Sequence, residues 1–375
     1  MKLAFYAPMK SPDHPVPSGD RRMGRLLFAA LQRAGFDVAL ASELRSYDGS
    51  GDPARQAEIR DEGARQAAAL IEKWQKDRAA APDAWFTYHL YHKAPDWIGP
   101  RVTEALNIPY IVAEASHAPK RASGPWKAGY DAAMQAIHAA GIVFPMTRHD
   151  SACLRAVVAE EERLQYLPPF IDVEGFLGSA ETVDINAEIL RGGGRAGVHN
   201  LLAVAMMRGG DKLESYRELG QSLARLGRDD WQLLVIGDGE RRADVEVALS
   251  PLGTRAVYLG AMAPGALPAW YRAADLYVWP AHGEAYGMAF LEAAACGLPV
   301  VAGDLRGVPD VVQNGRTGIL TPPGDFAAFA AAIDSLMGDA ARRAEMGATA
   351  RAFVREERNI SAAADRLRLC IERLF

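Results

Sequence analysis

The sequence predicts an α/β protein with two domains, each built on a doubly wound parallel sheet. Short apolar runs alternate with longer helical segments along the chain, which is the pattern of parallel strands joined by crossover helices. A length of 375 residues is enough for about two domains that each bury a core. Glycine-containing turns join several apolar runs directly to the helical segment that follows, as strand-to-helix turns do in such sheets.

The first domain is predicted to begin with a buried strand at residues 2–7, which ends at Pro8. A proline-rich loop leads to a helix at residues 21–34. The backbone at Ser18 and Gly19 lies just ahead of this helix, where an anion could bind to the helix N-terminus. The elements that follow are a strand at 36–41, a helix at 53–80, a strand at 83–89, a helix at 96–106, a strand at 108–114, a helix at 126–140, a strand at 141–146 and a helix at 149–158.

Residues 192–197 (GGGRAG) match the pattern GxGxxG, but we do not predict a dinucleotide site there. Such a site needs a strand before the glycines and a helix after them, whereas here a helical segment precedes and an apolar run follows. A flexible entry into the second domain is the better interpretation. That domain is predicted to hold strands at 198–207 and 256–262, a strand, Gly-Asp-Gly turn and helix over 231–249, and helices at 213–226, 267–275, 326–336, 341–357 and 360–374.

A basic pair, Arg208 and Lys212, stands where the apolar run at 198–207 ends and the next helix begins. Lys212 is the only lysine after Lys127, although 20 arginines lie between residues 181 and 375. An arginine can hold a diphosphate through two hydrogen bonds, and a lysine can add a point charge. The pair therefore predicts a diphosphate near this turn; a basic cap on a solvated helix is the alternative.

The stretch from Pro280 to Asp325 carries the densest signal for function. It follows an apolar run, and Gly283 and Gly287 bracket a turn before a helix predicted at residues 286–296. Helix N-termini at the carboxyl ends of parallel strands bind phosphate. Two glutamates, Glu284 and Glu292, frame the turn, and an ionised carboxylate can accept hydrogen bonds from two neighbouring hydroxyls. Sugars and riboses offer such hydroxyl pairs, so the stretch predicts a sugar-nucleotide site.

The same stretch resembles the donor-site signature of retaining glycosyltransferases of family 4, which have the two-domain GT-B fold. The resemblance covers Glu284-x7-Glu292 with Gly287, then CGLPVVA, a Gly-x-Pro-Asp helix start, and NGxTGxLxPPGD. It implies two Rossmann-like domains facing across a cleft, with a C-terminal helix that crosses back to the first domain. It also implies that Glu284 contacts the donor sugar and Glu292 the ribose. The implied phosphate contacts come from the turn at Tyr286 and the amides of Gly287, Met288 and Ala289.

Further site residues follow from the same resemblance. Arg208 and Lys212 would neutralise the leaving diphosphate, and the backbone around Gly260 would contact the base. Gly19 would line the cleft, although the family's double glycine is replaced by SGDR. His117 is the candidate for a histidine close to the donor sugar, with His89 and His92 as its rivals.

We expect a first, acceptor-side domain at residues 1–172, a linker at 173–197, a nucleotide-sugar domain at 198–357 and a crossover helix at 358–375. Acceptor specificity is expected in three loops of the first domain, at residues 9–20, 88–100 and 115–126.

The predicted reaction moves a hexosyl unit, with retention, from a UDP- or GDP-sugar to a hydroxyl acceptor. It requires no metal ion or cofactor. The acceptor would be a cell-envelope glycan, a lipid or a small metabolite, which places the enzyme in polysaccharide biosynthesis or a related pathway. Three alternatives stay open: a sugar-nucleotide epimerase, a phosphorylase, and a non-catalytic carbohydrate- or nucleotide-binding relic.

The composition indicates which binding partners and which cellular compartment to expect. The formal net charge of −5 leaves no basic excess for a polyphosphate backbone, which argues against nucleic acid. The three cysteines, Cys153, Cys296 and Cys370, form no CxxC pair and indicate a reduced, cytoplasmic protein without a zinc site. The N-terminal apolar run is too short for a signal peptide, and no run is long enough to span a membrane. Peripheral contact with the inner face of a membrane stays open.

Overall fold

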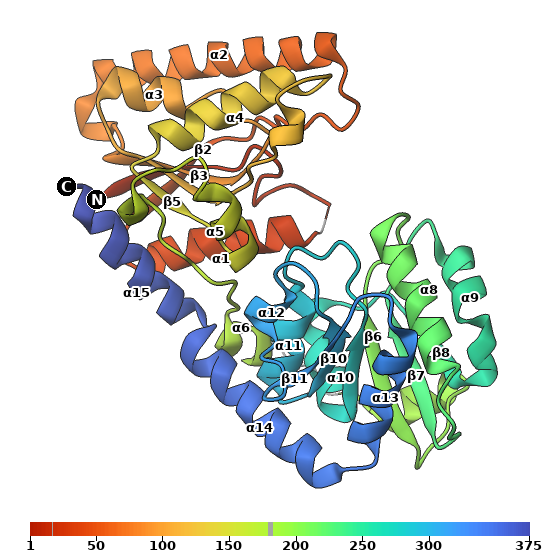
Figure 1. Cartoon of the computed structure of the whole chain (residues 1–375). Helices are drawn as coiled ribbons and strands as arrows, with labels where there is room; N and C mark the ends of the chain where they lie inside the picture. The colour runs from red at the N-terminus through yellow and green to blue at the C-terminus, as the bar shows by residue number, and fades with distance from the viewer. Residues whose placement is uncertain (17, 179–182) are drawn as a thin grey trace. The chain divides into compact units, whose positions relative to one another are not determined.

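The structure is a computed structural model that describes residues 1–16, 18–178 and 183–375. Its chain divides into two compact units. Unit 1 comprises Met1–Pro168 together with Ile360–Phe375, and unit 2 comprises Pro169–Asn359. Each unit is built on one parallel sheet with helices packed against it (Figure 1), so the predicted fold class of two Rossmann-like α/β units is confirmed.

Unit 1 has a five-stranded sheet in the order β2-β1-β3-β4-β5, with every neighbouring pair parallel. The strands are β1 (Lys2–Tyr6), β2 (Asp37–Ser42), β3 (Ala84–Leu90), β4 (Tyr110–Ala115) and β5 (Ile142–Phe144). The helices are α1 (Gly19–Arg33), α2 (Pro53–Lys76), α3 (Gly99–Leu106), α4 (Lys127–Ala139), α5 (Arg148–Leu154) and the last helix, α15 (Ile360–Ile371). Helix α15 packs against α1, so the C-terminus returns to the first unit, as predicted.

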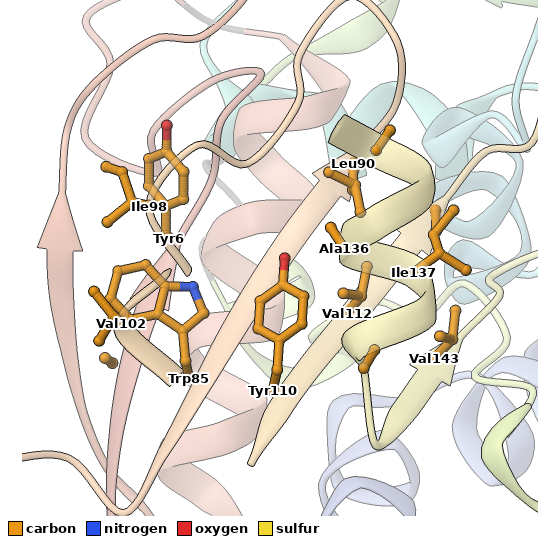
Figure 2. Close-up of a cluster of buried hydrophobic side chains, with 14 of the residues drawn as sticks. Tyr6, Trp85, Leu90, Ile98, Val102, Tyr110, Val112, Ala136, Ile137 and Val143 are labelled. Atoms are coloured by element: carbon orange, nitrogen blue, oxygen red, sulfur yellow. The ribbon is translucent and has the colours of Figure 1, made fainter. Parts of the chain in front are cut away.

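One hydrophobic core cluster of unit 1 lies between its sheet and helices α2, α3 and α4. Figure 2 shows Tyr6, Trp85 and Tyr110 projecting from three neighbouring strands into this core. Their polar atoms are paired in part through Asp96, whose carboxylate accepts a hydrogen bond from the Tyr110 hydroxyl at 2.9 Å. The same carboxylate accepts the amides of Ile98 and Gly99 at 2.8 and 2.7 Å. The sequence predicts that α3 begins at residue 96. This tight turn explains why the helix begins at Gly99 instead.

Unit 2 has a six-stranded parallel sheet in the order β11-β10-β9-β6-β7-β8. The strands are β6 (His199–Val204), β7 (Trp231–Ile236), β8 (Ala256–Gly260), β9 (Leu276–Trp279), β10 (Val300–Gly303) and β11 (Gly318–Thr321). The helices are α6 (Val173–Gly178), α7 (Ile185–Arg191), α8 (Asp211–Leu223), α9 (Arg242–Leu249), α10 (Leu267–Ala273), α11 (Met288–Cys296), α12 (Val308–Val311), α13 (Phe326–Met337) and α14 (Ala340–Glu357).

The segment predicted as a linker, residues 173–197, contains the short helices α6 and α7 where the structure describes it. Its residues 179–182 lie outside the described residues. Helix α7 precedes the glycines at 192–197, and β6 follows them, which is the element order inferred from the sequence. None of the described helices is long and apolar enough to cross a lipid bilayer.

The strand order of unit 2 reverses at β6, which lies between β7 and β9. The chain passes from β6 through α8 to β7 on one side of β6. The neighbour of β6 on its other side, β9, comes later in the chain. In open parallel sheets, ligands bind outside the carboxyl ends of the strands at such a switch point. In unit 1 the order reverses at β1, between β2 and β3. These two places are where functional side chains are expected.

We expect Gly237→Ala to lower the free energy of unfolding of unit 2 by about 2–4 kcal/mol. Gly237 follows β7 with a φ of 147°, and an added Cβ would overlap the carbonyl oxygen of Ala205. Gly227→Ala is the matched control, because an added Cβ there meets no atom within 4 Å. Urea denaturation of the two variants checks this prediction, and equal midpoints would contradict it.

Candidate active site

The candidate site of unit 2 lies at the carboxyl ends of β6 and β9, the two neighbouring strands at the switch point. The chain leaves β6 through Arg208 and enters α8 at Asp211, so Lys212 is the second residue of that helix. It leaves β9 at Trp279 and enters α11 at Met288. The turn between β9 and α11 carries Glu284. Two turns that are far apart in sequence thus meet at one edge of the sheet.

Lys212 and Glu284 form an ion pair across this edge. Both side chains are largely shielded, with exposed fractions of 27% and 17%. The Lys212 ammonium also lies 5.5 Å from the centroid of the Trp279 ring. Burial lowers the pKa of Lys212 to about 8; the charge of Asp211 opposes this change, and the charge of Arg208 adds to it. The structure therefore brings Arg208, Lys212 and Glu284 into one electrostatic group.

The turn that carries Glu284 is held against α8 by His282. The His282 amide donates a hydrogen bond to the Ser215 hydroxyl at 2.9 Å, and its Nε2 lies 2.5 Å from a carboxylate oxygen of Glu218. Glu218 and Ser215 are buried. Gly283 has a φ of 61°, and any side chain there would overlap the carboxylate of Asp211. These anchors fix Glu284, and sequence reasoning did not find His282, Ser215 or Glu218 because their partners are distant in the chain.

The sequence predicts that helix α11 begins at Tyr286, but in the structure it begins at Met288. Gly287 adopts a φ of 75° and ends the turn, which prevents helical geometry one residue earlier. The N-cap residue of this nine-residue helix, Gly287, has no side chain with which to cap the N-terminus. Met288 and Ala289 are its first two residues, so their amides lie at the positive end of the helix dipole. Tyr286, just before them, is buried.

Glu292 has different surroundings from Glu284. It lies on α11 with only 3% of its surface exposed, and its carboxylate accepts a hydrogen bond from the Tyr271 hydroxyl of α10 at 2.7 Å. Gly260 ends β8 with a φ of 72°, and its carbonyl accepts the Gly237 amide at 2.9 Å. Apart from Gly19 and His117, the predicted donor-site residues belong to unit 2, and among these only Arg208, Lys212 and Glu284 form one charged group.

The predicted residues of unit 1 occupy two places. Gly19 is the first residue of α1, whose N-terminus is capped by Ser18; the Ser18 hydroxyl accepts the Arg21 amide at 3.2 Å. His117 follows β4, and its Nε2 lies 3.1 Å from the hydroxyl of Tyr130 on α4. No hydrogen bond or ion pair joins Gly19 to His117 in the part of the chain that the structure describes. Their assignment to the site stays a prediction.

The switch point of unit 1 holds a charged group, here called the His89 cluster, made of Asp20, His89, Glu114 and Asp150. His89 Nδ1 lies 3.2 Å from an Asp20 carboxylate oxygen. The β3–β4 pairs Tyr88–Ala113 and Leu90–Ala115 place His89 opposite Glu114, and both residues have left-handed backbones, with φ of 63° and 55°.

Strained conformations of non-glycine residues at strand ends are typical of functional sites. The described residues include no group of His, Cys, Asp and Glu arranged to hold a metal ion. Sequence reasoning named His89 only as a rival to His117 and missed the three carboxylates. One available signal was that His89 and Glu114 are polar residues near the ends of otherwise apolar strands.

The charges of the His89 cluster shift two pKa values. Burial alone would lower the pKa of His89, but Glu114, Asp20 and Asp150 raise it to about 9. Burial raises the pKa of Glu114 to about 7, although His89 opposes the change. His89 is therefore expected to be a largely shielded imidazolium at neutral pH.

We expect the stability of unit 1 to fall as the pH rises through about 9. The folded-state pKa of His89 lies above its unfolded value of 6.5, so its contribution is complete below pH 6.5 and is lost above pH 9. The loss should be about 1–3 kcal/mol. Urea denaturation between pH 6.5 and 9.5 measures it. A His89→Gln variant should lose this dependence of stability on pH. The control His138→Gln, at an exposed position of α4, should retain it. An equal dependence on pH in both variants would contradict the assignment.

Comparison with known proteins adds a family match to this geometry. Residues 199–339, within unit 2, match the model of the family described as "Glycosyl transferases group 1". An alpha-D-kanosaminyltransferase of Streptomyces kanamyceticus is 32% identical over 157 residues, which cover 41% of this chain and 40% of the relative. A GDP-mannose-dependent alpha-(1-6)-phosphatidylinositol monomannoside mannosyltransferase of Mycolicibacterium smegmatis is 28% identical over 221 residues, or 56% of this chain and 57% of the relative. The matches thus span about half the length of these two relatives.

Solved structures share the fold over the whole chain. The Anabaena protein HepE, solved in complex with UDP, superposes with a TM-score of 0.74 at 17% identity and covers 100% of both chains. A sucrose-phosphate synthase from Thermosynechococcus elongatus gives a TM-score of 0.72 at 20% identity, covering 100% of this chain and 99% of the other. At these identities the likeness concerns the fold.

Proposed function

We propose that this protein is a retaining glycosyltransferase that moves a hexosyl unit from a nucleoside-diphosphate sugar to a hydroxyl acceptor. The observation that carries the proposal is the Lys212–Glu284 ion pair at the β6–β9 switch point, in which Glu284 lies on the turn that leads into α11. A cation, a helix dipole and a carboxylate at one strand edge are the groups that a sugar nucleotide needs. The family match over residues 199–339 supports the same reading.

The diphosphate is proposed to bind the amides of Met288 and Ala289 and the cations Arg208 and Lys212. In the free protein Glu284 neutralises Lys212. A bound diphosphate would take over that role, because it offers more charge and more acceptor oxygens than one carboxylate. Glu284 would then be free to accept hydrogen bonds from the hydroxyls of the hexose. Glu292 is proposed to approach the ribose, with Tyr271 orienting its carboxylate.

The reaction breaks the bond between the anomeric carbon and the diphosphate oxygen and forms one to the acceptor oxygen. Negative charge grows on the departing diphosphate, where Arg208, Lys212 and the α11 dipole stabilise it without reorganisation. These groups supply the neutralising charge that a metal ion provides in other transferases, so we propose a metal-independent reaction. By analogy with family 4, the acceptor proton passes to the leaving phosphate on the same face of the sugar.

A panel of UDP-, GDP- and ADP-sugars tests the proposal by thermal shift and by product analysis. A donor at about one hundred times its Kd should stabilise the folded protein by about 2.7 kcal/mol and raise the melting temperature by several degrees. NMR of the product with that donor should show the anomeric configuration of the donor. Absence of any nucleotide-dependent shift would overturn the proposal. Turnover of the sugar nucleotide without a glycosylated product would favour an epimerase.

A further inference from the structure

Cationic side chains gather around the indole of Trp126 in unit 1. The Lys93 ammonium and the Arg121 guanidinium each lie 4.8 Å from the centroid of this ring. Lys120 is the chain neighbour of Arg121. The indole is itself fixed, since its N–H donates a hydrogen bond to the Asp48 carbonyl at 3.3 Å. The ring therefore positions Lys93 and Arg121 while leaving their charge intact.

Within residues 1–16, 18–178 and 183–375, no ion pair joins Lys93, Lys120 or Arg121 to a carboxylate. The Nε of Arg121 is buried and has no acceptor among these residues. Asp48 lines the same small cavity as Lys93, but its carboxylate is already used. It accepts the Ser50 and Gly51 amides and the Gln56 side-chain amide, each at 2.9 Å. The charges of Lys93 and Arg121 thus stand together at this ring without a counter-charge, and the exposed Lys120 adds a third positive charge next to Arg121 in the chain.

His92 is the second, independent sign of a missing ligand. Both of its ring nitrogens are buried, and neither has a hydrogen-bond partner among the described residues. Burial, with the charges of Arg121, Lys93 and Lys120, lowers the pKa of His92 to about 4. The imidazole is therefore neutral at pH 7, with one N–H to donate and one nitrogen to accept. A buried donor of this kind is normally paired.

The position of these residues is that of a ligand site. His92 and Lys93 follow β3, and Lys120 and Arg121 lie in the turn Pro119–Arg121 after β4. Strands β3 and β4 are parallel neighbours, so both loops leave the same edge of the sheet. They also fall in two of the loops, 88–100 and 115–126, where acceptor specificity is expected.

The donors fit a phosphoryl group better than a carboxylate. A phosphoryl group presents up to two charges and three acceptor oxygens, which can engage a guanidinium fork, two ammonium groups and an imidazole N–H together. A carboxylate presents one charge and two oxygens, and it would leave more of this positive charge unbalanced.

We propose that Lys93, Lys120, Arg121 and His92 form a phosphoryl-binding site in unit 1, and that the glycosyl acceptor is a phosphorylated molecule held there. The identity of the acceptor rests on the proposed glycosyl transfer, whereas the phosphoryl-binding site does not depend on it. The phosphoryl group has two potential sources with the same chemistry, a soluble sugar or polyol phosphate and the headgroup of a phospholipid.

The test uses the full chain and the double variant Lys120→Gln/Arg121→Gln. The matched control is Lys73→Gln/Lys76→Gln, which removes the same charge from exposed positions of α2. Calorimetry with inorganic phosphate is performed in a Lys212→Met background, so that the candidate donor site does not contribute. We expect phosphate affinity to fall about tenfold or more in Lys120→Gln/Arg121→Gln and to stay unchanged in the control.

A second readout follows His92 by NMR. Phosphate should raise the pKa of His92 from about 4, because an anion among Lys93, Lys120 and Arg121 stabilises the imidazolium. The single variant Lys93→Gln serves if the double variant fails to fold. Unchanged phosphate affinity in the folded variant, or an equal loss in the control, would overturn the site.

Two further arms separate the sources of the phosphoryl group. Binding of glycerol 3-phosphate in solution is compared with binding of vesicles of phosphatidylglycerol in phosphatidylcholine. If either binds in a way that depends on Lys120 and Arg121, the result supports the site and identifies the source of the phosphoryl group. Phosphate binding without any nucleotide affinity would reject the proposed transferase and leave the site standing. Nucleotide affinity with no binding of phosphate, glycerol 3-phosphate or vesicles would reject the site alone.

Discussion

Glu284→Ala is expected to reduce glycosyl transfer by about 10²- to 10³-fold, through kcat and not through donor affinity. Glu284 is the carboxylate at the β6–β9 edge, and in the free protein it is paired with Lys212. Its removal takes away the group proposed to hold the hexose in the reacting position. The same change releases Lys212 for the diphosphate, so the Kd of UDP or GDP should stay equal or fall. Steady-state kinetics with the donor found in the panel, and calorimetry with the nucleotide, measure the two effects.

Two variants make this result specific. Glu284→Gln keeps the size of the side chain and removes its charge, and it should lose most of the activity. Glu240→Ala removes an exposed glutamate from the turn after β7 in the same unit, and it should turn over normally. Wild-type kcat in a folded Glu284→Ala protein would refute the catalytic assignment.

Lys212→Met is expected to weaken UDP or GDP binding by about 10²-fold. The Lys212 ammonium is largely shielded from water and pairs with Glu284 on the turn between β9 and α11. Water therefore screens its attraction to a diphosphate only weakly. Because the pKa of Lys212 is about 8 in the free protein, nucleotide affinity should also decline as the pH rises above about 8, where the lysine loses its proton. Lys212→Met should show no such decline.

Arg217→Met is the control for Lys212→Met, since it removes one positive charge from an exposed position of the same helix, α8. A double-mutant cycle with Glu284→Gln tests the coupling. If Glu284 competes with the diphosphate for Lys212, the nucleotide affinity gained by Glu284→Gln should vanish in the Lys212→Met background. Wild-type affinity and an unchanged pH profile in Lys212→Met would show that the diphosphate binds elsewhere.

Local sequence patterns predicted most elements of both units, but not the short strands β10 and β11 or the short helix α6. The runs IPYIVA and LLVIG are apolar throughout, as is typical of strands buried on both faces, and they lie in and next to β4 and β7. Helix starts were less well predicted, because they depend on individual residues. The left-handed Gly287 moved the start of α11 to Met288, and the Asp96 turn moved the start of α3 to Gly99.

The motif between Pro280 and Asp325 also indicated the chemistry of unit 2, since glycines, carboxylates and a helix start are recognisable in one continuous stretch. The grouping of side chains was decided by strand order. Lys212 and Glu284 are 72 residues apart, and they meet because β9 pairs with β6. Asp20, His89 and Glu114 come together because β3 lies between β1 and β4, and the cations around Trp126 come from loops after two different strands. Hydrophobic periodicity reports which residues are buried within an element, but the order of strands in a sheet depends on packing between distant segments, and no local pattern encodes it.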